Sequence, residues 1–224
     1  GKANVKSNYL DQCFDSVYVS NSTGSSVSGN TIVNTAGRAI TAYTDSGITV
    51  SGNMIKKTSD GRGITLESCS GTNSVTGNTV LEYSGFGIYV ISSSVNKIDS
   101  NKIGKGSTDA ITLNTSSNVT EINSNTFFAN SGNDLYLTGN ANAANYKNNS
   151  SDRNSVRINP GSSITARTGN TQHNYTFAAK TTVKPNCKSA GYTEYKCKDC
   201  TFTYKSDFSA PGDHTYVTST VAPT

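Results

Sequence analysis

The stretch Gly47-Ile-Thr-Val-Ser-Gly-Asn-Met-Ile55 recurs with small changes along the first two thirds of the 224-residue chain. Each well-formed copy has an apolar residue three positions before an asparagine and another apolar residue two positions after it. Steps of 21 to 25 residues separate these asparagines, which are Asn8, Asn30, Asn53, Asn78, Asn101, Asn125, a degraded copy at Asn149 and a fainter one at Asn170. A period in this range is typical of a solenoid, in which no single repeat can bury its own apolar face.

A second phrase, apolar-x-apolar, lies between the asparagines. Its copies are Val17-Tyr-Val19, Ile40-Thr-Ala42, Ile64-Thr-Leu66, Ile88-Tyr-Val90, Ile111-Thr-Leu113, Leu135-Tyr-Leu137 and Val156-Arg-Ile158. This alternation predicts short strands, two or three to a turn, that pair in parallel with their copies about 4.8 Å above and below. Asparagine tolerates the left-handed conformation at a corner, and its amide can bond the next asparagine, so we expect a structural ladder.

The pattern resembles the right-handed parallel β-helix repeat of the pectin-lyase-like superfamily over residues 4 to about 170. The resemblance implies an all-β solenoid of about seven turns over residues 1–171, with less regular turns after Gly139. The superfamily includes polysaccharide lyases, glycoside hydrolases, tailspikes, adhesins and epimerases, so the fold does not select a function. Residues 4–10 already lie inside a repeat, and we therefore expect the chain to be a fragment of a longer protein.

Composition narrows the classes of function. The net charge is +4, and six of the fourteen lysines lie between Lys180 and Lys205, so no basic stripe follows the solenoid. Nucleic-acid binding is therefore disfavoured. No apolar run approaches the roughly 18 residues that span a bilayer. We expect a monomer that neither crosses a membrane nor binds nucleic acid.

Composition changes at about Thr171, and residues 172–224 form a second predicted unit. The phrase His173-Asn-Tyr175 returns as His214-Thr-Tyr216, and three cysteines lie between the two copies. This segment resembles a small Cys-rich repeat of secreted surface proteins of gut-dwelling Gram-positive bacteria, although Thr201 stands where those repeats have glycine. The resemblance implies a small Cys-rich β domain on an extracellular or cell-wall-attached protein.

The cysteines of this segment are the strongest metal signal in the chain. Cys197 and Cys200 form a Cys-x-x-Cys pair, and Cys187 with His173 or His214 would complete a tetrahedral Zn²⁺ site. A disulfide between two of the three, or three reduced thiols, are the alternatives. Cys13 and Cys69 lie at different phases of the repeat and are expected to be single thiols.

Residues that point outward from the apolar-x-apolar strands suggest a carbohydrate-binding face. Tyrosine rings can lie against sugar rings, and threonine hydroxyls can bond sugar hydroxyls. The predicted contact residues are Tyr18, Thr41, Tyr43, Thr65, Glu67, Tyr89, Thr112 and Tyr136. The alternative is that tyrosine and threonine stand there because they are favoured strand residues.

Catalysis is the alternative function. Residues 1–172 contain no histidine. A polysaccharide lyase would need Ca²⁺ on clustered carboxylates and an Arg or Lys base. The candidates are Asp60, Arg62 and Asp109, although such a pair at a turn is more often a surface ion pair. We predict a non-catalytic module that binds a polysaccharide or cell-wall glycan or acts as a spacer, with a lyase as the alternative.

Overall fold

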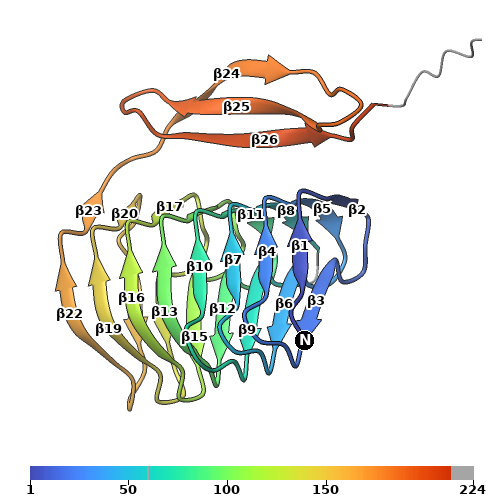
Figure 1. The fold of residues 1–224 in the computed structure, drawn as a ribbon. Helices are drawn as coiled ribbons and strands as arrows, with labels where there is room; N and C mark the ends of the chain where they lie inside the picture. Colours follow the sequence, from blue (N-terminus) through green and yellow to red (C-terminus); the bar gives the residue numbers. More distant parts are fainter. Residues whose placement is uncertain (60, 213–224) are drawn as a thin grey trace, which may run out of the picture. The chain divides into compact units, whose positions relative to one another are not determined.

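The computed structural model describes residues 1–59 and 61–212. The chain divides into two compact units, Gly1–Thr176 and Phe177–Thr224, which we call the solenoid unit and the C-terminal unit. In the solenoid unit the backbone winds through successive turns that each add strands to stacked sheets (Figure 1). No helix in the described residues is long and apolar enough to cross a membrane.

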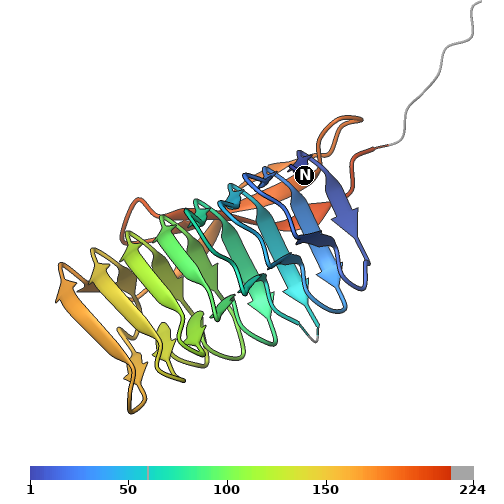
Figure 2. The same cartoon turned by 60° about the horizontal axis from the view of Figure 1, so that its bottom comes forward.

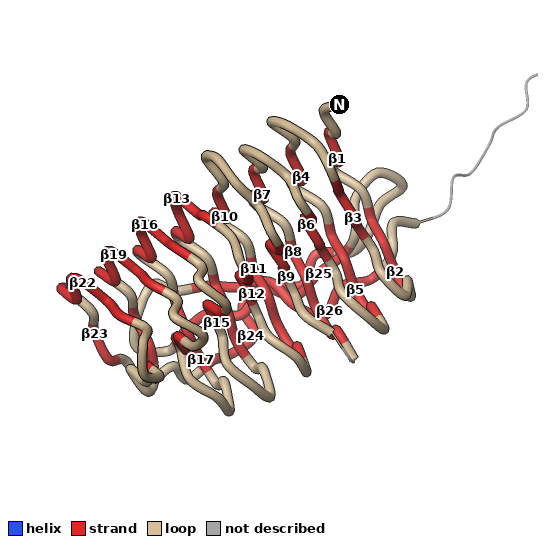
Figure 3. Tube along the Cα trace, turned by 90° about the horizontal axis from the view of Figure 1, so that it is seen from below, coloured by secondary structure: helices blue, strands red, loops and turns tan. Residues whose placement is uncertain are grey.

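Three parallel sheets, A, B and C, form the walls of the solenoid (Figures 2 and 3). Sheet A contains β1 (Asn4–Lys6), β4 (Ser26–Ser28), β7 (Thr49–Ser51), β10 (Ser74–Thr76), β13 (Ser94–Asp99), β16 (Asn118–Asn123), β19 (Asn142–Lys147) and β22 (Ser163–Thr168). Sheet B contains β2 (Tyr9–Asp11), β5 (Thr31–Thr35), β8 (Met54–Thr58), β11 (Thr79–Tyr83), β14 (Lys102–Gly104), β17 (Thr126–Phe128), β20 (Ser150–Ser151) and β23 (Thr171–Gln172). Sheet C contains β3 (Val17–Ser20), β6 (Ile40–Tyr43), β9 (Ile64–Glu67), β12 (Ile88–Ile91), β15 (Ile111–Asn114), β18 (Leu135–Leu137) and β21 (Val156–Ile158).

The strand register confirms the predicted period. Ile40 pairs with Ile64, and Ile64 pairs with Ile88, so residues one repeat apart occupy one column, meaning the same position in successive turns. Each turn passes through sheets A, B and C in that order. Parallel strands joined by such crossovers wind in the right-handed sense. The right-handed parallel β-helix expected from the repeat is therefore the fold of this unit.

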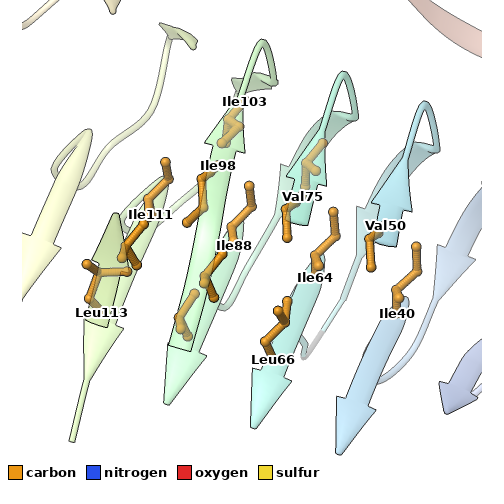
Figure 4. Packing of buried hydrophobic residues seen from close by; sticks show 14 of the residues in the cluster. Ile40, Val50, Ile64, Leu66, Val75, Ile88, Ile98, Ile103, Ile111 and Leu113 are labelled. Carbon is orange, nitrogen blue, oxygen red and sulfur yellow. The ribbon is translucent and has the colours of Figure 1, made fainter. Parts of the chain in front are cut away.

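Aliphatic columns from the three sheets fill the interior of the solenoid. Figure 4 shows Ile40, Ile64, Ile88 and Ile111 of sheet C in one row, all fully buried. The predicted loss of regularity after Gly139 begins later than expected, because β19 still pairs with β16 in register. Beyond it, β20 has only two residues, and Ile158 of β21 is 46% exposed. Tyr146 of β19 is buried in the inward column, and its large ring shares the space with the small side chains of Ala141 and Ala143.

The asparagine ladder is confirmed at the corner between sheets A and B. Asn53 Nδ2 and backbone N both donate to Asn78 Oδ1, at 3.0 and 2.9 Å, and the same pair of bonds links Asn30 to Asn53. The left-handed conformation, however, belongs to the preceding residue in each turn, as at Gly52 and Ser100. The ladder residue therefore contributes hydrogen bonds and not an unusual backbone.

The C-terminal unit is a three-stranded antiparallel sheet of β24 (Phe177–Val183), β25 (Gly191–Cys197) and β26 (Thr203–Ser209). Tyr204 of β26 packs on side chains of both other strands, with its ring 4.8 Å from that of Phe177 and 5.3 Å from that of Tyr195. The predicted boundary after residue 171 is too early, because β23 still pairs with β20. The solenoid unit extends to Thr176.

Candidate functional site

The outer face of sheet C carries the predicted sugar-binding residues. The register places Tyr18, Thr41, Thr65, Tyr89, Thr112 and Tyr136 in one column, and Tyr43 and Glu67 in the column two residues further along the strands. Thr41, Thr65, Tyr89 and Thr112 are buried, with at most 6% of any of them exposed. The expectation that these four residues contact a glycan is therefore wrong.

Side chains from its own and neighbouring turns cover Tyr89. The guanidinium carbon of Arg62 lies 4.0 Å from the centroid of the Tyr89 ring. The ring of Phe86 stacks on the same tyrosine at 4.8 Å, and Asn114 Nδ2 donates to the Tyr89 hydroxyl at 2.8 Å. Burial lowers the pKa of Arg62, and nearby Arg38 lowers it further, while Tyr89 and Glu67 oppose this. These side chains keep Tyr89 from solvent.

The first turns of sheet C remain accessible. Tyr18 is 57% exposed and Tyr43, on the next turn, is 37% exposed. Arg38 Nη1 lies 3.9 Å from Glu67 Oε2, and both side chains are partly exposed. Phe14, four residues before Tyr18, is 77% exposed and was not among the predicted contacts. The sequence offers one signal for the exposure of Phe14, because it is an aromatic residue that falls outside every apolar column of the repeat. We call Phe14, Tyr18, Arg38, Tyr43 and Glu67 the aromatic patch.

Tyr136 lies further along the same column and is half-buried. The guanidinium carbon of Arg157, on the following strand, is 4.9 Å from its ring centroid. Asn159 Nδ2 donates to the tyrosine hydroxyl at 2.8 Å. One face of this ring and its hydroxyl are therefore already occupied by protein groups.

The predicted catalytic residues do not form a cluster. Arg62 and Asp109 occupy equivalent positions two turns apart, and the register places Phe86 between them. Asp109 Oδ1 accepts hydrogen bonds from the backbone N and Nδ2 of Asn133, both at 2.7 Å. Asp60 lies outside the described residues. The Arg62 guanidinium thus lies over the Tyr89 ring, and the Asp109 carboxylate accepts hydrogen bonds from Asn133 in the following turn.

Two of the predicted thiol ligands come together in the C-terminal unit. Cys197 ends β25 and Cys200 lies in the turn before β26, with their Sγ atoms within 4.8 Å of each other. Burial raises the pKa of the Cys200 thiol, a hydrogen bond from the Phe202 backbone lowers it, and the neighbouring Cys197 raises it. Both residues are thiols in this structure.

Cys187 is not part of this thiol pair. It lies in the turn before β25, where Asn186 bridges to Ser189, whereas Cys197 is at the far end of that strand. A seven-residue strand spans about 20 Å, so a single ion cannot bind Cys187 and Cys197 together. The predicted three-cysteine site is therefore wrong in this respect.

Of the two predicted histidine ligands, the structure describes His173. His214 lies outside the described residues. His173 belongs to the solenoid unit, where its backbone N donates to Ser151 O at 2.8 Å and its ring meets the Tyr175 ring edge-on at 4.6 Å.

The remaining cysteines are single thiols, as expected. Cys13 is half-buried, whereas Cys69 is buried in the solenoid core. The Cys69 thiol donates to the carbonyl oxygens of Ala42 and Glu67, both at 3.5 Å. Burial raises the pKa of this thiol, which keeps it protonated and unreactive.

Comparison with known proteins identifies one family. The family model described as periplasmic copper-binding protein (NosD) matches residues 1–186, which covers the whole solenoid unit and ends just before Cys187. No curated protein matches the chain. Because the match covers well over half of the 224 residues, and the fold is the parallel β-helix that the repeat predicted, the chain belongs to the NosD family.

Proposed function

We propose that the chain is a non-catalytic β-helix module that works outside the cytoplasm as a monomer and binds an extended glycan over the aromatic patch. The family's description as periplasmic supports a place in or beyond the cell envelope. The observation that carries the glycan proposal is the exposure of Tyr18 and Tyr43 on adjacent turns, beside the partly exposed Arg38 and Glu67.

The geometry of the patch suits a polymer. Tyr43 lies on the strand next to that of Tyr18 and two residues further along it. Adjacent strands are about 4.8 Å apart, so the two rings are offset on the surface of sheet C. Aromatic rings bury the apolar faces of sugars and keep a hydroxyl for hydrogen bonding. Arg38 and Glu67 add a donor group and an acceptor group for sugar hydroxyls. Together these groups match the mixed apolar and polar surface of a carbohydrate.

Copper, which the family description names, does not fit the solenoid unit. The soft or imidazole donors of that unit are Cys13, Met54, Cys69 and His173. Cys13 and His173 lie in other turns than Met54 and Cys69, which share one turn but come from β8 and from the segment after β9. Cys69 is in the core, and its thiol donates hydrogen bonds to two carbonyl groups. Among the described residues of this unit, no set of these donors converges on one point. We therefore assign no copper-dependent step to the solenoid.

The glycan proposal can be tested with a panel of bacterial cell-wall polysaccharides and acidic plant polysaccharides. Isothermal titration should find at least one binder, and the double variant Tyr18→Ala/Tyr43→Ala should weaken it at least about tenfold, or about 1.4 kcal/mol. Tyr9→Ala, on sheet B at the same end of the stack, is the matched control and should bind normally. Equal affinity of the double variant and the parent would contradict the proposal.

The lyase alternative has its own readout in the same panel. Incubation with polygalacturonate and Ca²⁺ would produce unsaturated sugars if Asp60, Arg62 and Asp109 were catalytic. Such a product, abolished by Arg62→Ala, would replace our proposal. We expect none, because the Arg62 guanidinium lies over Tyr89.

A further inference from the structure

The turn between β25 and β26 holds its two thiols in a fixed arrangement. Cys197 N donates to Phe202 O at 2.9 Å, which closes the turn around residues 198–201. The Phe202 backbone in turn forms a hydrogen bond with Cys200. The Sγ atoms lie within 4.8 Å of each other, close to the separation of two sulfur atoms bound to one metal ion at about 2.3 Å each.

The number of donors decides which ion fits. Zinc in structural sites is almost always four-coordinate. In the described residues of the C-terminal unit, only Cys197 and Cys200 converge, and no carboxylate joins them. Cys187 is excluded by the length of β25. Two thiolates leave Zn²⁺ two ligands short, but they satisfy Cu(I), a soft ion that accepts low coordination numbers and prefers sulfur ligands.

The surroundings also favour a soft, weakly hydrated ion. Cys197 is only 1% exposed. The Phe177 ring lies 6.0 Å from that of Phe202 and 4.8 Å from that of Tyr204, so aromatic side chains surround the strand ends at this turn. Residues 177–212 contain six lysines and three acidic residues, which leaves an excess of positive charge in the unit.

We propose that Cys197 and Cys200 form a Cu(I) site in the C-terminal unit, separate from the glycan-binding patch. Binding replaces two S–H protons by one cuprous ion: Cu⁺ and two thiols give a bis-thiolate of charge −1 and two released protons. The lysine excess offsets that charge. Copper enters already reduced, so no electron transfer is involved. His173 is the sequence-based candidate for a third ligand, which Cu(I) also accepts.

Anaerobic titration of the full, reduced chain with Cu(I) against bathocuproine disulfonate tests the site. We expect one tightly bound Cu(I) per chain. Cys200→Ser, which replaces the more exposed thiol, and Cys197→Ser should each weaken binding at least about tenfold. Cys187→Ser is the matched control and should bind like the parent chain. Circular dichroism confirms that each variant is folded.

X-ray absorption of the copper-loaded parent chain supplies a readout that does not depend on any variant. Two sulfur ligands would support the proposal. Two sulfur ligands together with one histidine nitrogen would also support it, if the nitrogen ligand disappears in the His173→Gln variant. Undiminished Cu(I) binding by the Cys197→Ser/Cys200→Ser double variant would overturn it. A four-coordinate zinc ion bound by the parent chain with nanomolar affinity would also overturn it. None of these results bears on the glycan assay, so the two proposals can fail separately.

Discussion

At the scale of single residues, the ladder asparagines hold the turns together. Asn78 Oδ1 accepts two hydrogen bonds from Asn53, and Asn78 Nδ2 donates to Val50 O at 3.0 Å. All of these groups are buried, so removal of one side chain leaves several polar atoms without a partner, at about 1–3 kcal/mol for each. A ladder position should therefore matter more inside the stack than at its end.

Asn78→Ala should lower the free energy of unfolding by about 3 kcal/mol or more, because Asn53 and Val50 lose their partners inside the protein. Asn8→Ala is the matched control, since Asn8 is exposed and its side chain only donates to Asn30 Oδ1, at 2.9 Å. Its cost should be about 1 kcal/mol or less. Urea denaturation followed by circular dichroism measures both values. Equal losses would contradict a cooperative ladder.

Asp134 gives a prediction about pH. The residue is 1% exposed, and its Oδ2 accepts from Ser151 Oγ and Ser155 N at 2.7 and 2.6 Å. Oδ1 is buried and has no hydrogen-bond partner among the described residues. Burial raises the pKa of this carboxyl group despite those two bonds. The folded state therefore binds the proton more tightly than the unfolded state does.

The raised pKa of Asp134 fixes how the stability of the folded state changes with pH. The carboxylate costs no stability below its unfolded pKa of about 3.9, and it costs progressively more as the pH rises through the folded pKa. Asp134→Asn keeps an acceptor for Ser151 and Ser155 and removes the buried charge. Its melting temperature should exceed that of the parent at pH 7, and the difference should vanish below the unfolded pKa. Asp11→Asn, which changes an exposed side chain, is the control. A variant less stable than the parent at neutral pH would refute this account.

At the scale of elements, the corner before sheet C depends on close contact between turns. Gly85 N donates to Gly61 O at 2.9 Å, and a Cβ on Gly61 would lie 1.7 Å from Gly37 O. No rotation of a side chain relieves that overlap, because the neighbouring atom belongs to the backbone. The spacing of adjacent turns therefore requires glycine at this corner.

Gly61→Ala should prevent folding of the stack or lower its unfolding free energy by more than about 3 kcal/mol, well beyond ordinary overpacking. Gly52→Ala is the control, because its φ is +61° but no atom lies within 4 Å of the added methyl group. It should cost only about 1 kcal/mol of backbone strain. Comparison of urea midpoints distinguishes the two effects. A mild Gly61→Ala phenotype would show that the turns can separate.

At the scale of the whole molecule, the solenoid unit is a one-dimensional stack in which each turn contacts only its neighbours. Because Ile40, Ile64 and Ile88 occupy one column, deletion of residues 64–87 joins Gly63 to Ile88 in the correct register. The shortened chain should fold, with a β-sheet spectrum and a lower melting temperature. Deletion of residues 64–75 removes half a turn and should abolish cooperative unfolding. Similar behaviour of the two deletions would contradict stacking in register.

The fold of the solenoid was predictable because its determinants are local and repeated. Inward aliphatic columns and ladder asparagines recur at one period, and parallel pairing of equivalent residues follows from that period alone. Tyr146, three residues before Asn149, takes the inward position that this period assigns to it, and Ala141 and Ala143 of the same turn are buried in the same core cluster.

The stacking of turns, the identity of the core columns and the Cys-x-x-Cys turn could all be read from the amino-acid sequence. Which outward residues face solvent depends on contacts in the folded chain, because Arg62 and Phe86 contact Tyr89 from other parts of the repeat. The tertiary structure also decided that Cys187 lies apart from Cys197. Ten residues of sequence separation can form a compact loop or an extended strand, and here hydrogen bonding along β25 holds the segment extended.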